Sequence, residues 1–216
     1  VMEKSKLTRY IDKVRIGGAV GQAQIVTKDD VSHTWVAADS RDALVVLKMS
    51  KSTIGNSTLG IGDLSKFSGL LSALGTDISF DVSSIERDGI QKAVEVNSSD
   101  DYGNTMKYML HDTSVVPSSD GKQVKHLFEQ EFNVKFTMDS NFISKFIQGK
   151  GALGDEVETF TIVTKDNKVS VVIGWRIEHS NSLSIPVKPQ VYDDVDKVFF
   201  SSQIMADILS ANKECE

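Results

Sequence analysis

Apolar residues spaced three and four positions apart mark two segments of the chain as amphipathic helices. Their apolar faces consist of Leu7, Tyr10, Ile11 and Val14 in the first segment, and Phe142, Phe146 and Ile147 in the second. Ser140 precedes the second segment and is expected to cap it. Two more helices are predicted at residues 63–74 and 202–212. The chain therefore contains two pairs of helices far apart in the sequence.

Short runs of β-branched and apolar residues lie between the helices of each pair and predict strands. The expected strands are residues 23–27, 32–37 and 43–49, then 159–164, 168–175 and 182–187. Turn residues separate the first two strands of each set, Asp29-Asp30 in one and Asp166-Asn167 in the other. Further strands are expected only after the first helix pair, at residues 77–83, 90–96 and 105–116.

The order helix, strands, helix occurs twice because part of the sequence is repeated. Ile-Val-Thr-Lys-Asp at residues 25–29 recurs at residues 162–166, an offset of 137. A Val-Ser pair follows at offset 138, which predicts one inserted residue in the turn, and Leu-Ser-Ala at residues 71–73 recurs at residues 209–211. We expect an α+β protein made of a duplicated domain, with antiparallel sheets and two helices in each copy.

The repeat also predicts the domain limits. Domain one is expected at residues 1–116, a polar linker at residues 117–124 and domain two at residues 125–216. Copy two lacks a counterpart of the strands that follow the second helix of copy one, about 40 residues. The second copy is therefore expected to be truncated, without its C-terminal strands.

Composition limits the class of protein. The chain has 216 residues, 40% hydrophobic and 25% charged, which suits one large or two small cores. No apolar run approaches the roughly 20 residues of a membrane span, and the first residues do not resemble a signal peptide. The single cysteine, Cys215, cannot form an internal disulfide. These features predict a cytoplasmic protein with no membrane contact.

Residues 37–47, Ala-Ala-Asp-Ser-Arg-Asp-Ala-Leu-Val-Val-Leu, resemble a stretch of the DNA sliding clamps. In proliferating cell nuclear antigen and its archaeal relatives, Asp-Ser or Asp-Pro-Ser precedes a strand there. Residues 62–71 are similar to the second helix of the family's first domain, and the early first helix is more like the clamps of tailed phages. A phage origin would make the location the host cell cytoplasm.

The resemblance implies the DNA-clamp fold and a processivity factor that encircles duplex DNA. It also implies no enzymatic activity, no cofactor and no metal. Two domains per chain imply a homotrimer, because the family's ring has six domains. The expected partners are double-stranded DNA, bound without sequence preference, a DNA polymerase and a clamp loader.

Charge is distributed as that function requires. The chain has a net charge of −6, yet residues 4–16, 63–74, 141–150 and 202–213 hold nine basic and three acidic residues, net +6. The rest, with 15 basic and 27 acidic residues, carries −12. Helices line the hole in the family, so the expected DNA-binding residues are Lys4, Lys6, Arg9, Lys13, Arg15, Lys66, Lys145, Lys150 and Lys213. On a helix, Lys6, Arg9 and Lys13 share one side, away from the apolar face.

The resemblance further implies two protein-binding sites. A groove for a partner peptide is expected between Ser40, Arg41, Asp42 and Ala43 on one side and Val115, Val116 and Pro117 on the other. The Arg41-Asp42 pair departs from the more apolar pattern of cellular clamps. The subunit interface is expected to pair two strands, one containing Met106, Tyr108 and Leu110 and the other Leu183, Ile185 and Val187.

Other candidate chemistry has weak support. The histidines, His33, His111, His126 and His179, have no closely spaced ligand partners, and the acidic run at residues 193–196 lacks calcium-loop spacing. The glycines at residues 17–21 follow a helix and are expected to end it. Trp35 and Trp175 are expected in the core.

The alternative function is a duplicated β-rich binding or structural protein, such as a phage virion component, without DNA contact. Trimerisation together with salt-sensitive DNA association would distinguish the clamp from it.

Overall fold

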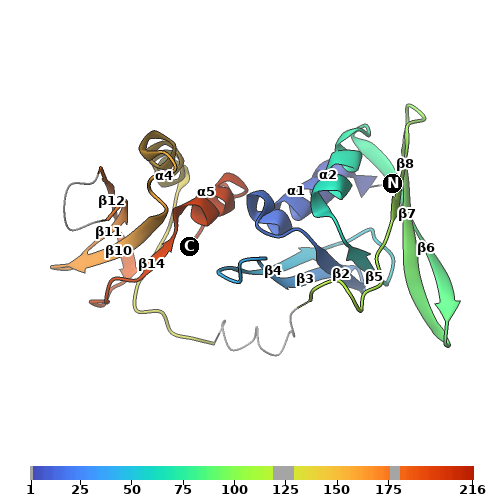
Figure 1. The fold of residues 1–216 in the computed structure, drawn as a ribbon, viewed down its shortest axis with the longest axis horizontal. Coiled ribbons are helices and arrows are strands. Elements are labelled where there is room, and N and C mark those ends of the chain that lie inside the picture. The colour runs from blue at the N-terminus through green and yellow to red at the C-terminus, as the bar shows by residue number, and fades with distance from the viewer. Residues whose placement is uncertain (1, 119–128, 176–180) are drawn as a thin grey trace. The chain divides into compact units, whose positions relative to one another are not determined.

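The computed structural model describes residues 2–118, 129–175 and 181–216, and the chain divides into two compact units (Figure 1). Unit 1 is residues 1–128 and unit 2 is residues 129–216. The predicted linker, residues 117–124, lies largely outside the described residues, as do His126 and His179, and the domain limits stay a prediction. Among the helices that the structure describes, none is long and apolar enough to cross a bilayer.

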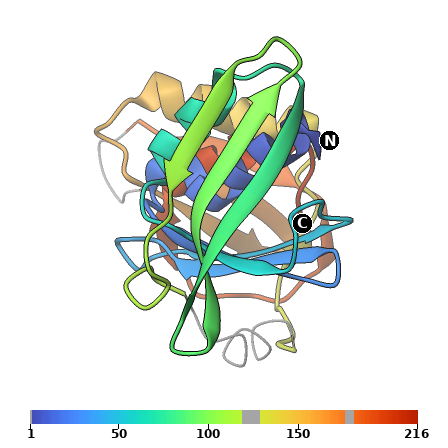
Figure 2. The same ribbon diagram turned by 90° about the vertical axis from the view of Figure 1, so that its right-hand side faces the viewer.

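The described part of unit 1 contains two antiparallel sheets, one of which carries two helices on one face (Figures 1 and 2). The helices are α1 (Lys4–Arg15) and α2 (Leu64–Ser72), and a short 3-10 turn, η1 (Ile16–Gly18), follows α1. The first sheet has the order β4-β3-β2-β5, with β2 (Ala23–Lys28), β3 (Val31–Ala37), β4 (Leu44–Ser50) and β5 (Ser57–Ile61). The second has the order β1-β6-β7-β8, with β1 (Met2–Glu3), β6 (Asp77–Arg87), β7 (Ile90–Asp100) and β8 (Thr105–Met109).

The described part of unit 2 has two helices, α4 (Ser140–Leu153) and α5 (Ser202–Ser210), packed on a sheet of order β12-β11-β10-β14. The strands of that sheet are β10 (Thr159–Lys165), β11 (Lys168–Ile173), β12 (Leu183–Val187) and β14 (Phe199–Ser201). A two-stranded ladder joins β9 (Lys135–Phe136) to β13 (Pro189–Val191). The predicted α+β class is confirmed.

Identical strand order confirms the duplication. The order β4-β3-β2-β5 in unit 1 repeats as β12-β11-β10-β14 in unit 2. The first hairpin of each unit closes through two residues of positive φ, Asp29 (50°) and Asp30 (59°), then Asp166 (51°) and Asn167 (60°). Positive φ at both turn positions matches the twist of the flanking strands, and Asp and Asn tolerate it. Both units therefore use the same turn geometry.

The predicted insertion in this turn is wrong. Lys28 pairs with Val31 across the first turn and Lys165 pairs with Lys168 across the second, so the offset stays 137 through both hairpins. The repeated Val-Ser pair is one residue out of structural register. The offset reaches 138 by the third strands, because Met49 pairs with Ser32 as Val187 pairs with Val169, and it stays 138 at the second helices, α2 and α5.

The core of unit 1 lies between the helices and the first sheet. Leu7, Ile11 and Phe67 are fully buried there. A polar pair lies in the same layer, because the Tyr10 hydroxyl donates a hydrogen bond to Thr34 Oγ1 at 2.7 Å. Burial raises the pKa of Tyr10 to about 12. The hydrogen bond satisfies a hydroxyl that would otherwise be costly to bury.

The core of unit 2 is apolar and aromatic. The ring of Phe146 lies between those of Phe142 and Phe160, with centroids 6.0 and 5.4 Å away. Val171 and Ile173 of β11 complete the cluster. Aromatic pairs at these distances add to the stabilisation that burial provides.

Three details of the helix and strand ends differ from expectation. Asp139, rather than Ser140, caps α4, because its extended backbone lets the carboxylate accept a hydrogen bond from the Phe142 amide at 2.8 Å. The helix α1 ends where predicted, but Ile16 takes the left-handed conformation. The strand expected at residues 105–116 stops at Met109, because Asp112 accepts a hydrogen bond from the Ser114 amide and turns the chain.

The prediction that both tryptophans lie in the core is wrong. Trp35 is half-buried and stacks on His33, with ring centroids 5.2 Å apart. Its neighbour Thr34 bonds to Tyr10 of α1, so strand alternation turns Trp35 to the face away from the helices. Trp175 follows β11 and is half-buried beside Lys197, whose Nζ lies 5.0 Å from the ring centroid.

Sheet edges distinguish the two units. Both β8 and β12 are edge strands of their sheets. In unit 1 the edge of β5 is covered, because the His111 amide donates to the Gly60 carbonyl at 2.8 Å. In unit 2 the corresponding strand β14 exposes Phe199 and Phe200, by 51% and 45%. The described part of unit 2 holds no counterpart of β6–β8, and a single bridge between Met138 and Cys215 stands where β1 and β6 pair in unit 1.

Candidate nucleic-acid interface and partner surfaces

The exposed side of the two helices in unit 1, the helix layer, carries basic side chains and small residues. The helices α1 and α2 lie side by side and bury their apolar faces against the sheet. The exposed residues are Ser5, Lys6, Arg9 and Asp12 of α1, and Ser65, Lys66, Gly69 and Ser72 of α2. Small residues let a charged polymer approach the helix backbone, so this surface suits contact with phosphates.

Four cations of this layer remain available to a ligand. Arg9 and Lys66 are exposed, and within the described residues neither side chain has a hydrogen-bond or ion-pair partner. Lys13 is half-buried and also has no partner in the part that the structure describes. Lys6 is exposed and donates to two carbonyl oxygens at the end of β4 and just beyond it, 3.0 and 2.7 Å away.

Two other predicted DNA-binding residues stabilise unit 1. The Lys4 ammonium donates to the carbonyl oxygen of Leu74, just after the end of α2. The Arg15 guanidinium donates to Ser65 Oγ at 3.0 Å and lies 3.8 Å from Asp12, so it links α1 to α2. Both are half-buried, and their side chains are committed to these contacts.

The three predicted DNA-binding lysines of unit 2 lie in three different environments. Lys145 is exposed on α4 and has no partner among the described residues. Lys213 is exposed but lies beyond the end of α5. Lys150 was expected to face DNA and does not: it is 8% exposed, and its Nζ donates to the Gly154 carbonyl at 2.8 Å. Lys150 therefore closes the C-terminal end of α4.

The predicted peptide site is in part exposed. The loop between β3 and β4 is tightly folded, since the Ala38 amide donates to the Ala43 carbonyl at 2.8 Å and Arg41 has a φ of 63°. Ser40, Arg41 and Asp42 are exposed, and Ala43 is half-buried.

On the other side of the predicted groove, Gln24 Nε2 donates to the carbonyls of Thr113 and Val116, both at 2.7 Å. Val115 is 69% exposed, Pro117 is exposed, and Val116 is 4% exposed and cannot line a groove.

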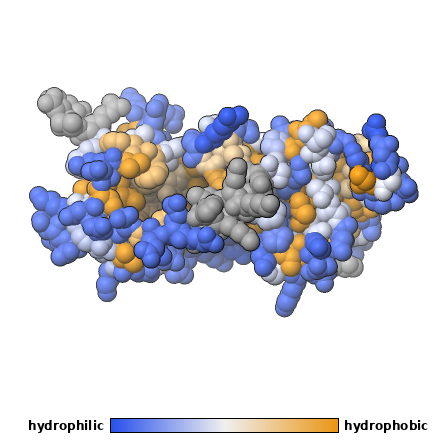
Figure 3. All heavy atoms as spheres, turned by 90° about the horizontal axis from the view of Figure 1, so that it is seen from below, coloured by the Kyte–Doolittle hydropathy of each residue, from blue (hydrophilic) through white to orange (hydrophobic). Residues whose placement is uncertain are grey.

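A group of apolar residues on β3 and β4 was not predicted as a site. Trp35 pairs with Val46, and Leu44, 39% exposed, pairs with Ala37. Pairing and strand alternation place all of them on the face away from the helices. Apolar side chains gather between hydrophilic ones on that side of the molecule (Figure 3). We call Trp35, Leu44 and Val46 the outer patch.

No protein-family model and no curated protein matches the chain. Solved structures do match. Proliferating cellular nuclear antigen from Entamoeba histolytica superposes with a TM-score of 0.70 at 18% identity, over 98% of this chain and 84% of that one. A PCNA2-PCNA3 complex from Sulfolobus tokodaii gives a TM-score of 0.68 at 12% identity, over 99% and 84%. The chain has the sliding-clamp fold.

The two strands predicted to form the subunit interface lie at open sheet edges. Several of the side chains predicted to contact a neighbour point into the cores of the units instead. Met106 and Tyr108 face the core of unit 1, and Ile185 faces that of unit 2, each 5% exposed or less. These three side chains cannot contact a neighbour, because alternation turns them inward. Leu110, Leu183 and Val187 are half-buried. The strand backbones remain the predicted interface.

The structure contains, in the residues it describes, no group of three or more His, Cys, Asp or Glu side chains arranged to hold a metal ion. The surfaces that remain are the basic helix layers, the outer patch and the strand edges.

Proposed function

We propose that this chain is a subunit of a ring-shaped sliding clamp, a homotrimer that encircles duplex DNA and tethers a polymerase without catalysing a reaction. The observation that carries the proposal is the combination of the fold with the unpaired cations. The solved clamps match over nearly the whole chain. The side chains of Arg9, Lys66 and Lys145 lie on helices and have no partner among the described residues, although the protein as a whole is acidic.

The charges fit movement along DNA better than a fixed complex. Isolated lysines and arginines contact phosphates without reading base edges, so binding is independent of sequence and weakens as salt rises. The acidic remainder of the chain repels DNA and favours contact at the helix layers.

Retention on closed DNA tests this function. We expect the protein to stay on a nicked circular duplex during gel filtration at about 0.15 M salt and to leave the same DNA after linearisation, because a ring slides off an end. A matching clamp loader should raise the retained fraction. Equal loss from circular and linear DNA would overturn the proposal and favour a structural protein without DNA contact.

The outer patch is proposed as the site for a polymerase peptide. A helical segment with apolar anchors could bury its side chains against Trp35 and Leu44. In a Trp175→Phe background, titrating the C-terminal peptide of the partner polymerase should change Trp35 fluorescence. Leu44→Asp should abolish the change, whereas Lys48→Asp, an exposed position on the same strand, should preserve it. An unchanged signal in the parent protein would place the site elsewhere.

A further inference from the structure

The β6–β7 hairpin of unit 1 extends past the end of β8 and leaves part of β7 with a strand on one side only (Figure 2). The strand β8 pairs with residues 95–99, and one further bond joins the Leu110 amide to the Val94 carbonyl at 2.9 Å. Among the described residues, residues 90–93 pair with β6 alone. Residues that flank a two-residue hairpin turn bond to each other, so Gln91 and Ala93 direct their amides and carbonyls to the open side.

The strand β5 is open over a neighbouring stretch. It is the outer strand of the first sheet and lies against β7. The His111 amide covers its edge at Gly60, and backbone alternation turns the amide and carbonyl of Thr58 outward on the same side. Leu110 and His111 bond to β7 and β5 respectively, so they close one end of the space between the two strands.

A groove of about 450 Å³ lies between these two edges. Thr58, Gln91 and Ala93 all line it. An extended segment that enters the groove therefore meets backbone donors and acceptors that no other strand uses. Such an edge is what strand addition by a partner requires.

One face of the hairpin supplies the apolar part of the groove. Ile85 pairs with Lys92 and Arg87 pairs with Ile90, and opposed residues share a face of the ladder. All four residues line the groove. Ile85 is 51% exposed and Ile90 is 61% exposed. An apolar side chain packed against them would remove this surface from water.

The unpaired charge that the described residues bring to the groove is positive. The Ser114 amide and the Lys92 ammonium, 3.0 Å away, hold the pKa of the Asp112 carboxyl below its usual range. Lys92 and Asp112 therefore neutralise each other. The side chain of Arg87 is exposed and has no partner in the described part of the chain. Glu86 lies on the opposite face of the hairpin because side chains alternate along a strand.

We propose that this groove binds an extended segment of a partner protein that adds antiparallel to β7 and carries an apolar residue followed two positions later by an acidic one. The apolar residue lies opposite Lys92, beside Ile85, and the acidic residue lies opposite Ile90, beside Arg87. The groove is distinct from the outer patch, because β2 separates β5 from the strands of that patch. Neither the ring nor the DNA contact is needed for this binding.

Fluorescence anisotropy on the full chain with labelled synthetic peptides tests the proposal. The peptide Gly-Ser-Thr-Ile-Thr-Glu-Thr-Ser has its isoleucine and glutamate on one face of a strand. The control peptide, Gly-Ser-Thr-Ile-Glu-Thr-Thr-Ser, has the same composition but places them on opposite faces. We expect the control peptide to bind about tenfold more weakly. Binding of the first peptide should also slow hydrogen exchange at residues 90–93, and a methyl group on the amide of the threonine between its isoleucine and glutamate should prevent binding.

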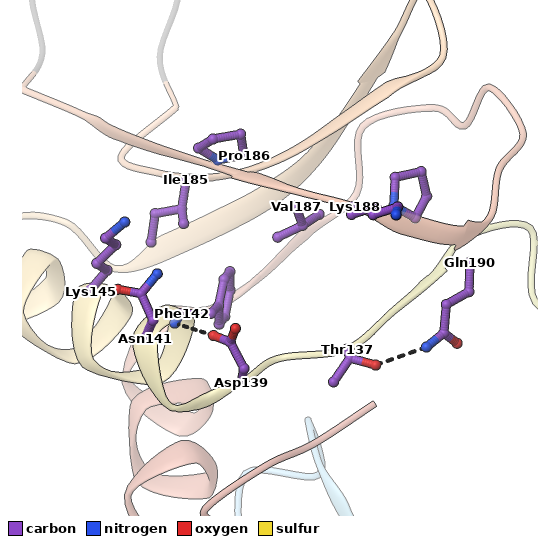
Figure 4. Close-up of a pocket in the computed structure, with 11 residues that line it drawn as sticks. Thr137, Asp139, Asn141, Phe142, Lys145, Ile185, Pro186, Val187, Lys188 and Gln190 are labelled. Carbon is purple, nitrogen blue, oxygen red and sulfur yellow. Dashed lines mark hydrogen bonds between the residues drawn. The ribbon is translucent and has the colours of Figure 1, made fainter.

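Two substitutions test the assigned side-chain contacts. Arg87→Glu should weaken binding about tenfold, and a peptide with lysine in place of glutamate should recover part of the loss on that variant. Ile90→Ser should weaken binding with an unchanged melting temperature, because Ile90 is 61% exposed. The matched control is Lys188→Glu, which reverses an exposed charge at a separate cavity of about 490 Å³ in unit 2 (Figure 4). It should leave peptide binding unchanged.

The outcomes identify what covers the groove. Equal affinity of the two peptides, no binding of either at about 1 mM, or wild-type affinity of the Arg87→Glu variant overturns the proposal. If neither peptide binds but Ile90→Ser lowers self-association in sedimentation equilibrium, a second copy of the chain covers the groove instead. A chain that leaves circular and linear DNA equally and still binds the first peptide overturns the ring and keeps this site.

Discussion

Reversing two charges on the helix layer of unit 1 provides a quantitative test of the DNA contact. Arg9 and Lys66 are exposed and unpaired within the described structure, so replacing both with Glu removes no internal bond. Residues 4–16 and 63–74 hold six basic and two acidic residues, so their net charge falls from +4 to zero.

Counterion release sets the expected magnitude. Each phosphate contact contributes about 0.9 to the slope of log K against log salt, so a fourfold rise in salt weakens binding about threefold per contact. If both residues contact phosphates, Arg9→Glu with Lys66→Glu should lower the slope by about 2. It should also weaken equilibrium binding to a short linear duplex by about tenfold or more at 0.1 M salt.

The assay is equilibrium binding to a short linear duplex between about 50 and 200 mM salt. Lys28→Glu with Lys48→Glu is the matched control: it changes the net charge equally at exposed positions of the sheet. An equal effect of both pairs would show that overall charge, rather than the helix layer, governs binding. An unchanged slope for the Arg9 and Lys66 pair would refute the reasoning.

Three further predictions concern stability. Phe146→Ala should lower the free energy of unfolding by about 3–5 kcal/mol in urea titrations, because a fully buried ring leaves a cavity; a loss below about 1 kcal/mol would contradict the packing. The raised pKa of Tyr10 means that stability present below pH 10 is lost as pH rises toward about 12, and Tyr10→Phe should reduce that loss in denaturant titrations. Lys150→Met should lower stability by about 1–2 kcal/mol, through the lost bond to Gly154, with unchanged DNA retention; weaker retention would restore Lys150 to the DNA surface.

The repeat made most of the fold predictable. Two copies of one pattern constrain each other, so the helices and the first three strands of each copy were placed to within a few residues. The assignment of faces was less reliable. Lys150 follows Phe146 by four residues and Phe142 by eight, so helical spacing alone places it on the buried side. Counting charges over whole helical segments did not consider which face of the helix is buried.

For the strands, the difficulty was to decide which of the two faces is buried. Alternation separates Trp35 from Thr34 but does not say which face is inside. The core side of β3 carries Ser32 and Thr34, so polarity indicated the wrong face.

The polar pair in the core of unit 1 has an evolutionary consequence. In unit 2 the strand registers put Val171 in the place of Thr34, and the buried residues of α4 in the same cluster, Phe142, Ile143 and Phe146, are all apolar. A duplicated gene starts with identical halves, so one half exchanged both partners. The order of exchange matters, because a buried hydroxyl without a partner is costly. Thr34 Oγ1 also donates to the Gln24 carbonyl at 3.1 Å, so Thr34 keeps a hydrogen bond when a phenylalanine replaces Tyr10. A tyrosine that faces a valine instead loses the only hydrogen bond that its hydroxyl makes among the described residues. A history that began with a hydroxyl pair is therefore less costly if an apolar residue replaced the tyrosine first, and one that began with an apolar pair is less costly if it gained its threonine first.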